Sequence, residues 1–169
     1  MLNSKRKKLI AISFLFPNSE QSNHGVFVLN RLKAMNKYVD ITVINPIADS
    51  FIHKSISRYA YLSKIPEVEI IDGIKVYHPR FFSIPGHFKS IEFFTYRKAV
   101  KSVLDRIGYD FDLIDLHWTF PDLPCGYWLS KKMAKPFNVT LRGMEAFHQQ
   151  DAGLRKYIVA HYLKKADKI

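Results

Sequence analysis

Apolar runs and amphipathic stretches alternate along this chain. The apolar runs are nearly continuous, which is typical of parallel strands buried on both faces, and they cover residues 8–16, 40–46, 113–118 and 137–141. The amphipathic stretches place apolar residues at helical spacing, over residues 26–37, 92–107, 124–134 and 154–166. This alternation predicts an α/β fold: a doubly wound domain with a mostly parallel sheet.

Turn and cap residues agree with these elements. Gly108 follows the second helix as a C-cap, Pro124 lies in the first turn of the third helix, and Pro46 stops the second strand. Residues 167–169 have the pattern of a strand that begins there. The expected boundaries therefore rest on local chemistry as well as on periodicity.

The middle of the chain is less regular. Residues 67–79 predict two short strands around a turn at Asp72-Gly73, and an aromatic loop follows at residues 81–86. Residues 47–66 form an amphipathic, positively charged segment. Its pattern fits a surface helix and an ordered loop equally well.

Composition predicts one globular domain over residues 1–169, since 47% of the residues are hydrophobic. Cys125 is the only cysteine, so no disulfide framework or cysteine metal cluster is expected, and a reducing, cytoplasmic setting is the simplest interpretation. Residues 5–16 imitate the basic and apolar regions of a signal peptide. Residues 17–20 carry no small-residue cleavage pattern, which favours a first strand instead.

The net charge of +11 favours anionic partners. One candidate is an anionic membrane surface, contacted by the basic segments 52–64 and 154–168, which would place the protein peripherally on the inner face of the membrane. Solvated helix faces account for the same residues equally well. No recognition-helix motif or aromatic RNA-binding signature is visible, so nucleic acid is not an expected partner.

Polar residues follow two of the predicted strands. His117 ends the run at 113–118, and Arg142, Gly143 and Glu145 follow the run at 137–141. Ligands bind beyond the carboxyl ends of strands in an open parallel sheet, so a small-molecule site is expected there. His117 could act at a reacting centre or be held within the fold. Arg142 could pair with a phosphate, or it could form an ion pair with Glu145 that holds the loop.

Gly25 lies just before the first predicted helix. Free N–H groups and the helix dipole favour a phosphate at such a position, and a tight turn would require a glycine there too. The loop lacks the G-x-G-x-x-G pattern of a dinucleotide site. No cluster of ligand residues indicates a metal.

Several motifs, in chain order, resemble the group 4 glycosyltransferases, which are retaining enzymes of the GT-B class. They are Phe16-Pro17-Asn18 with His24-Gly25-Val26-Phe27-Val28, Asp115-Leu116-His117-Trp118 with Pro121-Asp122, the run from Val139 to Glu145, and Ala166-Asp167 after the last helix. The resemblance covers nearly the whole chain. The chain departs from the family pattern at Glu145, where aspartate is more usual, and at Leu123, where glycine is frequent.

The resemblance implies roles for single residues. His117 would be the catalytic residue, Gly25 would lie near the donor diphosphate, and the substrate-binding residues would be His24, Arg142, Gly143 and Glu145. It implies no metal and no cofactor, with a nucleotide sugar as substrate.

The resemblance also implies a second domain with a different binding role. GT-B enzymes have two Rossmann-like domains, and this chain resembles the N-terminal, acceptor-binding one; the C-terminal donor-binding domain is not among the 169 residues. The whole enzyme would move a sugar from a nucleotide sugar to a carbohydrate or lipid-linked acceptor, as in polysaccharide biosynthesis. The chain alone is expected to be inactive, whether as a fragment, the product of a truncated gene, or half of a split enzyme. The alternative function is a non-catalytic, membrane-associated binding subunit that needs a partner donor domain; a third class is an anion-binding domain of unrelated function.

Overall fold

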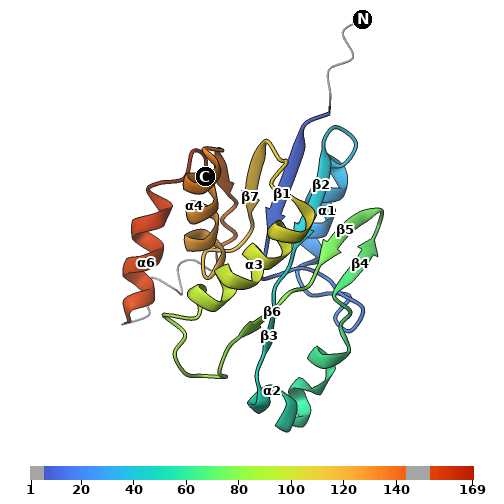
Figure 1. Cartoon of the computed structure of the whole chain (residues 1–169), viewed down its shortest axis with the longest axis vertical. Helices are drawn as coiled ribbons and strands as arrows, with labels where there is room; N and C mark the ends of the chain where they lie inside the picture. Colours follow the sequence, from blue (N-terminus) through green and yellow to red (C-terminus); the bar gives the residue numbers. More distant parts are fainter. Residues whose placement is uncertain (1–5, 144–152) are drawn as a thin grey trace, which may run out of the picture.

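The computed structural model describes residues 6–143 and 153–169. Six strands form one sheet in the order β4-β5-β2-β1-β7-β8 (Figure 1). Neighbouring strands are parallel except for the β4–β5 pair. The strands are β1 (Lys8–Ile12), β2 (Asp40–Ile44), β4 (Val68–Ile71), β5 (Ile74–Tyr77), β7 (Leu113–Leu116) and β8 (Phe137–Val139).

Helices cover both faces of this sheet. They are α1 (Val26–Met35), α3 (Phe93–Ile107), α4 (Asp122–Met133) and α6 (Leu154–Leu163). Side chains alternate between the two faces along a strand. Leu9 and Ala11 of β1 therefore pack with α1, while Ile10 and Ile12 pack in the core that contains α3 and α4. The predicted doubly wound α/β fold is confirmed.

The predicted hairpin is also confirmed. β4 and β5 pair antiparallel, with Ile71 opposite Ile74. Asp72 and Gly73 connect them with φ angles of 49° and 79°. Positive φ at both central residues is the requirement of a type I′ turn, which an Asp-Gly pair meets at little cost.

Two strands that the sequence did not predict form a separate two-stranded sheet beyond the carboxyl edge. β3 (Ile47–Asp49) pairs in parallel with β6 (Arg80–Phe82). Pro46 and Pro79 separate this pair from β2 and β5, because proline has no N–H to donate to a ladder. The predicted aromatic loop at residues 81–86 is therefore wrong in its first two residues, which belong to β6.

The ambiguous segment at residues 47–66 is mostly helical. After β3 it forms the short helix α2 (Phe51–Ser55) and the 3₁₀ helix η1 (Ser57–Lys64). The Arg80 guanidinium holds the end of η1 by donating to the carbonyl of Leu62 at 2.7 Å and to the carbonyl of Ile65. Residues that are distant in sequence thus fix this segment above the sheet.

The first predicted strand overruns the real one. β1 ends at Ile12, and Ser13 then turns the chain out of the sheet by donating from Oγ to the carbonyl of Leu15 at 2.6 Å. Phe16 is nevertheless fully buried, against the α1 side of the core. At the other end of the chain, Lys168 forms a parallel bridge with Asn138, as expected of a strand that begins at residue 167.

Candidate functional site

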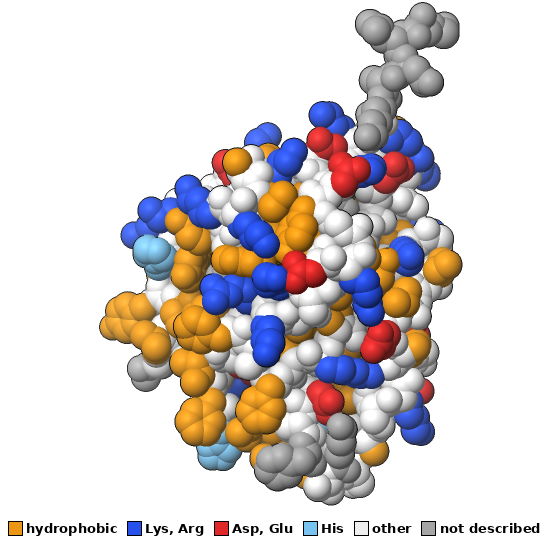
Figure 2. Space-filling view, in the orientation of Figure 1, with side chains coloured by type: hydrophobic (Ala, Val, Ile, Leu, Met, Phe, Trp, Pro, Cys, Tyr) orange, Lys and Arg blue, Asp and Glu red, His pale blue; other side chains and the backbone are white. Residues whose placement is uncertain are grey.

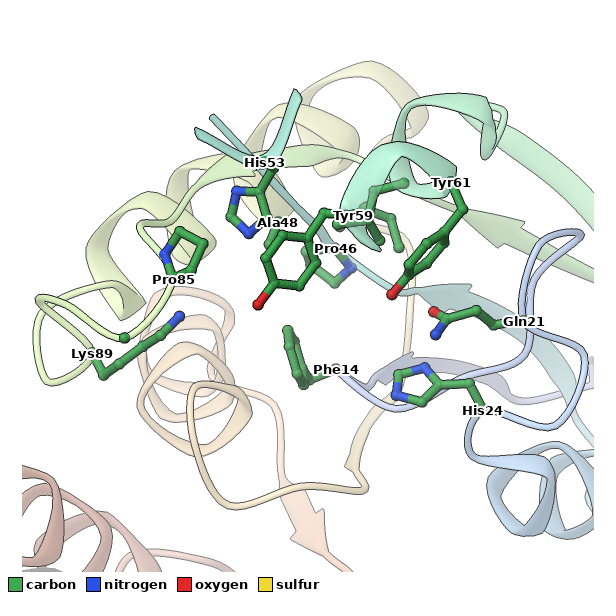
Figure 3. A pocket seen from close by; sticks show the side chains of 13 residues that line it. Phe14, Gln21, His24, Pro46, Ala48, His53, Tyr59, Tyr61, Pro85 and Lys89 are labelled. Carbon is green, nitrogen blue, oxygen red and sulfur yellow. The ribbon is translucent and has the colours of Figure 1, made fainter. Parts of the chain in front are cut away.

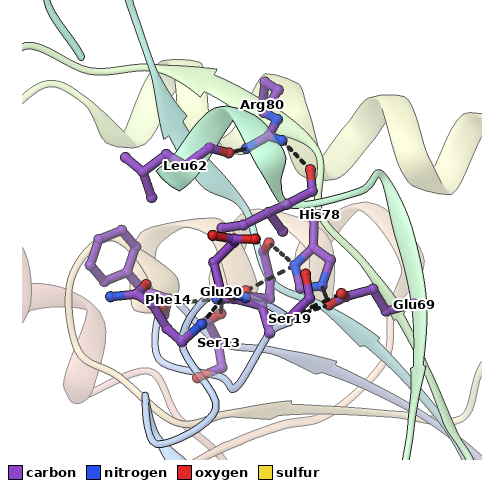
Figure 4. A network of polar contacts seen from close by, with 12 residues as sticks. Ser13, Phe14, Ser19, Glu20, Leu62, Glu69, His78 and Arg80 are labelled. Carbon is purple, nitrogen blue, oxygen red and sulfur yellow. Dashed lines mark hydrogen bonds and ion pairs between the residues drawn. The ribbon is translucent and has the colours of Figure 1, made fainter. Parts of the chain in front are cut away.

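Polar side chains meet where β1, β2 and β5 end. Asn45 Nδ2 donates to the carbonyls of Ser13 at 2.7 Å and Phe14 at 3.0 Å. Asn45 Oδ1 in turn lies 3.0 Å from Nδ1 of His78 (Figure 4). All three contacts join residues that directly follow a strand. Side-chain hydrogen bonds therefore connect β1, β2 and β5 at the carboxyl edge, where the backbone hydrogen bonds of the sheet end.

The same network reaches the edge strand and the first loop. His78 Nε2 lies 2.9 Å from Glu69 Oε2, and Glu69 Oε1 accepts from the Ser19 N–H at 3.2 Å. Burial lowers the pKa of His78, while the adjacent Glu69 carboxylate opposes that shift. The network (Ser13, Ser19, Asn45, Glu69 and His78) holds the loop between β1 and α1 against the sheet.

A cavity of about 270 Å³ opens beyond this edge. Its walls come from the loop after β1, from β3, from η1 and from the loop before α3, and their side chains surround a common space (Figure 3). The lining residues are Phe14, Gln21, His24, Pro46, Ile47, Ala48, His53, Tyr59, Tyr61, Leu62, Pro85, Gly86 and Lys89. We call this space the edge pocket. It combines aromatic rings with neutral and charged hydrogen-bonding groups.

Burial sets the charge state of the two histidines in the edge pocket. It lowers the pKa of His24, and it lowers the pKa of His53 with the help of the nearby Lys89 cation. Both rings are therefore neutral at pH 7, and one nitrogen of each is already used: His24 hydrogen-bonds to the backbone of Phe16, and His53 Nδ1 lies 2.7 Å from Ser50 Oγ. Lys89 is itself paired with Glu92 at 2.9 Å.

The structure encloses His117. Its side chain is fully buried at the end of β7, and Nε2 lies 3.2 Å from Asp115 Oδ2 without hydrogen-bond geometry. Arg31 of α1 lies 3.7 Å from the same carboxylate oxygen. Neither ring nitrogen of His117 hydrogen-bonds to another atom in the described part of the chain. His117 does not line the edge pocket, and its predicted catalytic role stays a prediction.

Gly25 has a structural reason to be glycine. It begins α1 with φ at 74°, and a Cβ there would lie 2.7 Å from the carbonyl carbon of Leu15. Both the left-handed backbone and the close approach of Leu15 exclude a side chain. This favours the tight-turn alternative and leaves the phosphate role a prediction.

The structure brings Arg142 to the beginning of α1. Its guanidinium lies 4.5 Å from the ring centre of Phe27, in the first turn of the helix. Gly143 follows in an exposed turn with φ at 90°, and a Cβ would meet nothing within 4 Å there. Glu145 lies outside the described residues. Its predicted substrate contact and the alternative ion pair with Arg142 therefore both stay predictions.

The predicted site residues thus separate into three places. His24 lines the edge pocket, Arg142 lies over Phe27 in the first turn of α1, and His117 is buried directly after β7. Sequence reasoning missed Asn45 and His78, although both follow apolar strand runs as His117 does. It also missed Tyr59, Tyr61 and Lys89, which reach the pocket from segments whose folded position no local pattern reveals.

The described residues contain neither a cluster of metal ligands nor a helix able to span a membrane. No three or more His, Cys, Asp or Glu side chains are placed to hold a metal ion within residues 6–143 and 153–169. No helix in these two ranges has the length and apolar character needed to cross a bilayer.

Comparisons with known proteins agree with this architecture. No protein-family model matches the chain. It is 29% identical over 145 residues to TuaC of Bacillus subtilis (strain 168), described as a teichuronic acid biosynthesis glycosyltransferase, an alignment that covers 82% of this chain and 36% of that protein. The chain therefore spans little more than a third of the length of this relative.

Solved structures show the fold. Sucrose-phosphate synthase from Thermosynechococcus elongatus superposes with a TM-score of 0.59 at 12% identity, covering 96% of this chain and 41% of that one. A protein from Listeria monocytogenes described as a UDP-N-acetylglucosamine 2-epimerase gives a TM-score of 0.55 at 10% identity, covering 96% and 38%. The chain has the Rossmann-like fold of GT-B glycosyltransferases, and its sequence resembles a glycosyltransferase.

Proposed function

We propose that this chain is the acceptor-binding domain of a glycosyltransferase and that the edge pocket holds the acceptor. The whole enzyme would transfer a sugar from a nucleotide sugar to a glycan or a lipid-linked glycan. The observation that carries the proposal is the pocket itself. It lies at the carboxyl edge of a parallel sheet, the usual ligand position in this class of fold, and its lining suits a carbohydrate.

A sugar presents hydroxyl groups around its ring and apolar C–H faces above and below. Tyr59 and Tyr61 project from η1 into the edge pocket, opposite Phe14 and Gln21 (Figure 3). Their rings can cover a C–H face of a sugar, and their hydroxyls can hydrogen-bond to it. The neutral His24, whose N–H is bonded to the backbone of Phe16, adds one acceptor nitrogen. A glycan acceptor therefore fits this lining better than a purely apolar ligand.

The donor would lie on the other side of the β1–α1 loop. The first N–H groups of α1 and the guanidinium of Arg142, held over Phe27, form a positive end that suits a diphosphate. His24 and Gly25 would then separate an acceptor site from a donor-phosphate site. His117 is proposed to act from beneath this junction, with Asp115 orienting its ring.

A second domain would supply the remaining donor contacts. The chain covers 36% of TuaC and 41% of the synthase, so most of each of these proteins lies outside the matched part. We propose that a C-terminal GT-B domain, within the same protein or as a partner, binds the nucleotide. The nucleotide sugar and the glycan are the proposed substrates, and no resident cofactor is proposed.

Transfer kinetics test the assignment of the two sites. The assay uses a protein that joins this chain to a donor-binding GT-B domain, with variants at Tyr61 and Arg142. Tyr61→Ala is expected to raise the KM for the acceptor about tenfold and leave the KM for the nucleotide sugar unchanged, while Arg142→Ala does the opposite. If Tyr61→Ala changes only the donor KM, the edge pocket is not the acceptor site.

A further inference from the structure

An apolar groove of about 300 Å³ lies on the far side of the loop that borders the edge pocket. It is formed by residues 82–95, and its lining is nearly free of polar surface. Four large side chains on its rim remain strongly exposed, and we call them the rim residues: Phe82, Phe88, Ile91 and Phe94. Burying such side chains is favourable, so this much exposed apolar surface in one place indicates a docking surface.

The backbone holds one rim residue outward against its conformational preference. Phe88 has φ at 55°, in the left-handed region that bulky side chains rarely adopt, and 70% of it is exposed. A side chain that is exposed to this extent makes few contacts that stabilise the fold. Strain that persists at an exposed aromatic tip is typical of a residue kept for binding rather than for folding.

Cations flank the rim residues. Arg97 lies 5.6 Å from the ring centre of Phe94 and 5.7 Å from that of Trp128. Lys131 and Lys132 extend the same surface along α4, over Tyr127 and Trp128. Figure 2 shows Lys and Arg side chains gathered over α3 and α4, with hydrophobic side chains below and beside them.

Among the described residues, these three cations (Arg97, Lys131 and Lys132) form no direct ion pair, although Lys132 Nζ donates to the Tyr109 hydroxyl at 3.0 Å, which donates to Asp105 at 2.7 Å. Within the described part of the chain, no carboxylate comes within ion-pairing distance of any of them. Aromatic rings beside unpaired cations match the two layers of a bilayer surface, which are acyl chains and anionic headgroups. The rim residues protrude instead of enclosing a tunnel, so a bilayer fits them better than a single lipid chain.

We propose that the rim residues insert into an anionic bilayer, with Arg97, Lys131 and Lys132 on its phosphates. This surface differs from the basic segments 52–64 and 154–168, for which the sequence left a membrane surface and a solvated surface as alternatives. It also places the edge pocket next to the membrane, because the loop at residues 83–89 contributes to both. Membrane binding does not depend on the proposed glycan site, and each can be tested without the other.

Vesicle co-sedimentation of the 169-residue chain tests the proposal. The probes are vesicles of equal parts phosphatidylglycerol and phosphatidylcholine, and vesicles of phosphatidylcholine alone. Binding is expected to the anionic vesicles at about 50 mM NaCl and to weaken strongly at about 500 mM, where charges are screened. No binding to the anionic vesicles at low salt would overturn the proposal.

Matched variants separate this surface from general charge attraction. Phe88→Ser with Phe94→Ser, and separately Lys131→Glu with Lys132→Glu, are each expected to lower the partition coefficient about tenfold or more. The controls are Ile70→Ser, which is 76% exposed on β4, and Lys37→Glu, which is exposed beyond the end of α1. All these positions are at the surface, and circular dichroism checks that each variant folds. Equal losses in patch and control variants would overturn the proposal, as would patch variants that bind like the unmodified chain.

Discussion

His78 Nε2 lies 2.9 Å from Glu69 Oε2, and this contact joins the exit of β5 to the edge strand β4. His78 is fully buried and Glu69 is nearly so, and through Asn45 and Ser19 the pair connects to the loops around the edge pocket. A buried polar network whose members are hydrogen-bonded fixes geometry more than it adds net stability. The pair therefore fixes the position of the loops around the edge pocket, which is the proposed acceptor site.

Removing the charge from Glu69 should destabilise the protein measurably. Glu69→Gln keeps the shape but weakens contacts to His78 and Ser19, with an expected loss of about 1–3 kcal/mol in unfolding free energy. Glu67→Gln is the matched control, because Glu67 is 74% exposed and pairs with Arg106 at 3.4 Å. An exposed pair contributes about 0–1 kcal/mol. Urea unfolding followed by tryptophan fluorescence measures both, and equal losses would contradict the assigned role of Glu69.

His53 should make stability depend on pH. Burial and the Lys89 cation lower the pKa of His53 below that of the unfolded chain, although Asp49 and Glu92 oppose them. The folded state therefore disfavours the proton, so this contribution is present above the unfolded pKa near 6.5 and is lost as pH falls through the folded pKa. Unfolding free energy should fall between about pH 7.5 and pH 5.

Substitution isolates the contribution of this histidine. His53→Gln should reduce the slope and leave the part that His24 and His78 contribute, while His161→Gln, at an exposed position on α6, serves as the control. Urea unfolding at a series of pH values supplies the data. A slope that is the same in His53→Gln and in the unmodified chain would show that the titration of His53 does not contribute.

His117 and Asn45 offer a contrast between two buried polar residues that follow β7 and β2, the two strands on either side of β1. Asn45 uses both ends of its amide, whereas neither ring nitrogen of His117 has a hydrogen bond in the described structure. Asn45→Leu should cost about 2–4 kcal/mol of unfolding free energy, because it breaks several buried hydrogen bonds. His117→Leu should cost less than Asn45→Leu, since no hydrogen bond is lost and the Asp115 carboxylate keeps Arg31 at 3.7 Å.

The two substitutions should affect glycosyl transfer in the opposite order, with His117→Leu as the more damaging. If His117 acts at the reacting centre, His117→Leu lowers kcat about 10²–10⁴-fold in a protein that carries a donor-binding domain, although it folds normally. Asn45→Leu should affect transfer only as far as it affects folding. A stable His117→Leu variant with unchanged kcat would remove His117 from the catalytic machinery.

Gly25 should be intolerant of any side chain. Gly25→Ala would force a Cβ against the carbonyl of Leu15 and would strain the left-handed backbone, at an expected cost of about 1–3 kcal/mol. Gly153→Ala is the control, because its φ is negative and nothing lies within 4 Å of the added Cβ. Thermal unfolding compares them, and equal midpoints for the two variants would mean that the α1 turn is not tight.

The sequence predicted the sheet, the helices and the hairpin because their signals are local. Continuous apolar runs, the Asp72-Gly73 turn and the cap at Gly108 each act within a few residues, and the structure confirms all of them. The strand pair β3–β6 escaped prediction because each member has three residues, too few for a period to show. Its pairing depends on β2 and β5 lying side by side, which is a tertiary fact.

The site was less predictable for the same reason. The position of His117 at a strand exit was correct, but burial depends on what covers the exit, and no local pattern reports that. The same strand-exit argument applied to Asn45 and His78 would have found the polar network. Tyr59 and Tyr61 belong to a segment whose periodicity is ambiguous, and tertiary contacts such as those of Arg80 with η1 place them.

Glycan binding by the edge pocket is the most direct test of the central claim. Isothermal titration of a panel of soluble oligosaccharides into the 169-residue chain should detect binding by at least one glycan class. Tyr59→Ala with Tyr61→Ala should weaken it about tenfold or more through lost stacking and hydrogen bonds, while Tyr38→Ala, at a 77% exposed position beyond α1, should not. Binding that survives the double substitution, or that Tyr38→Ala weakens equally, would contradict the assignment of this pocket to the acceptor.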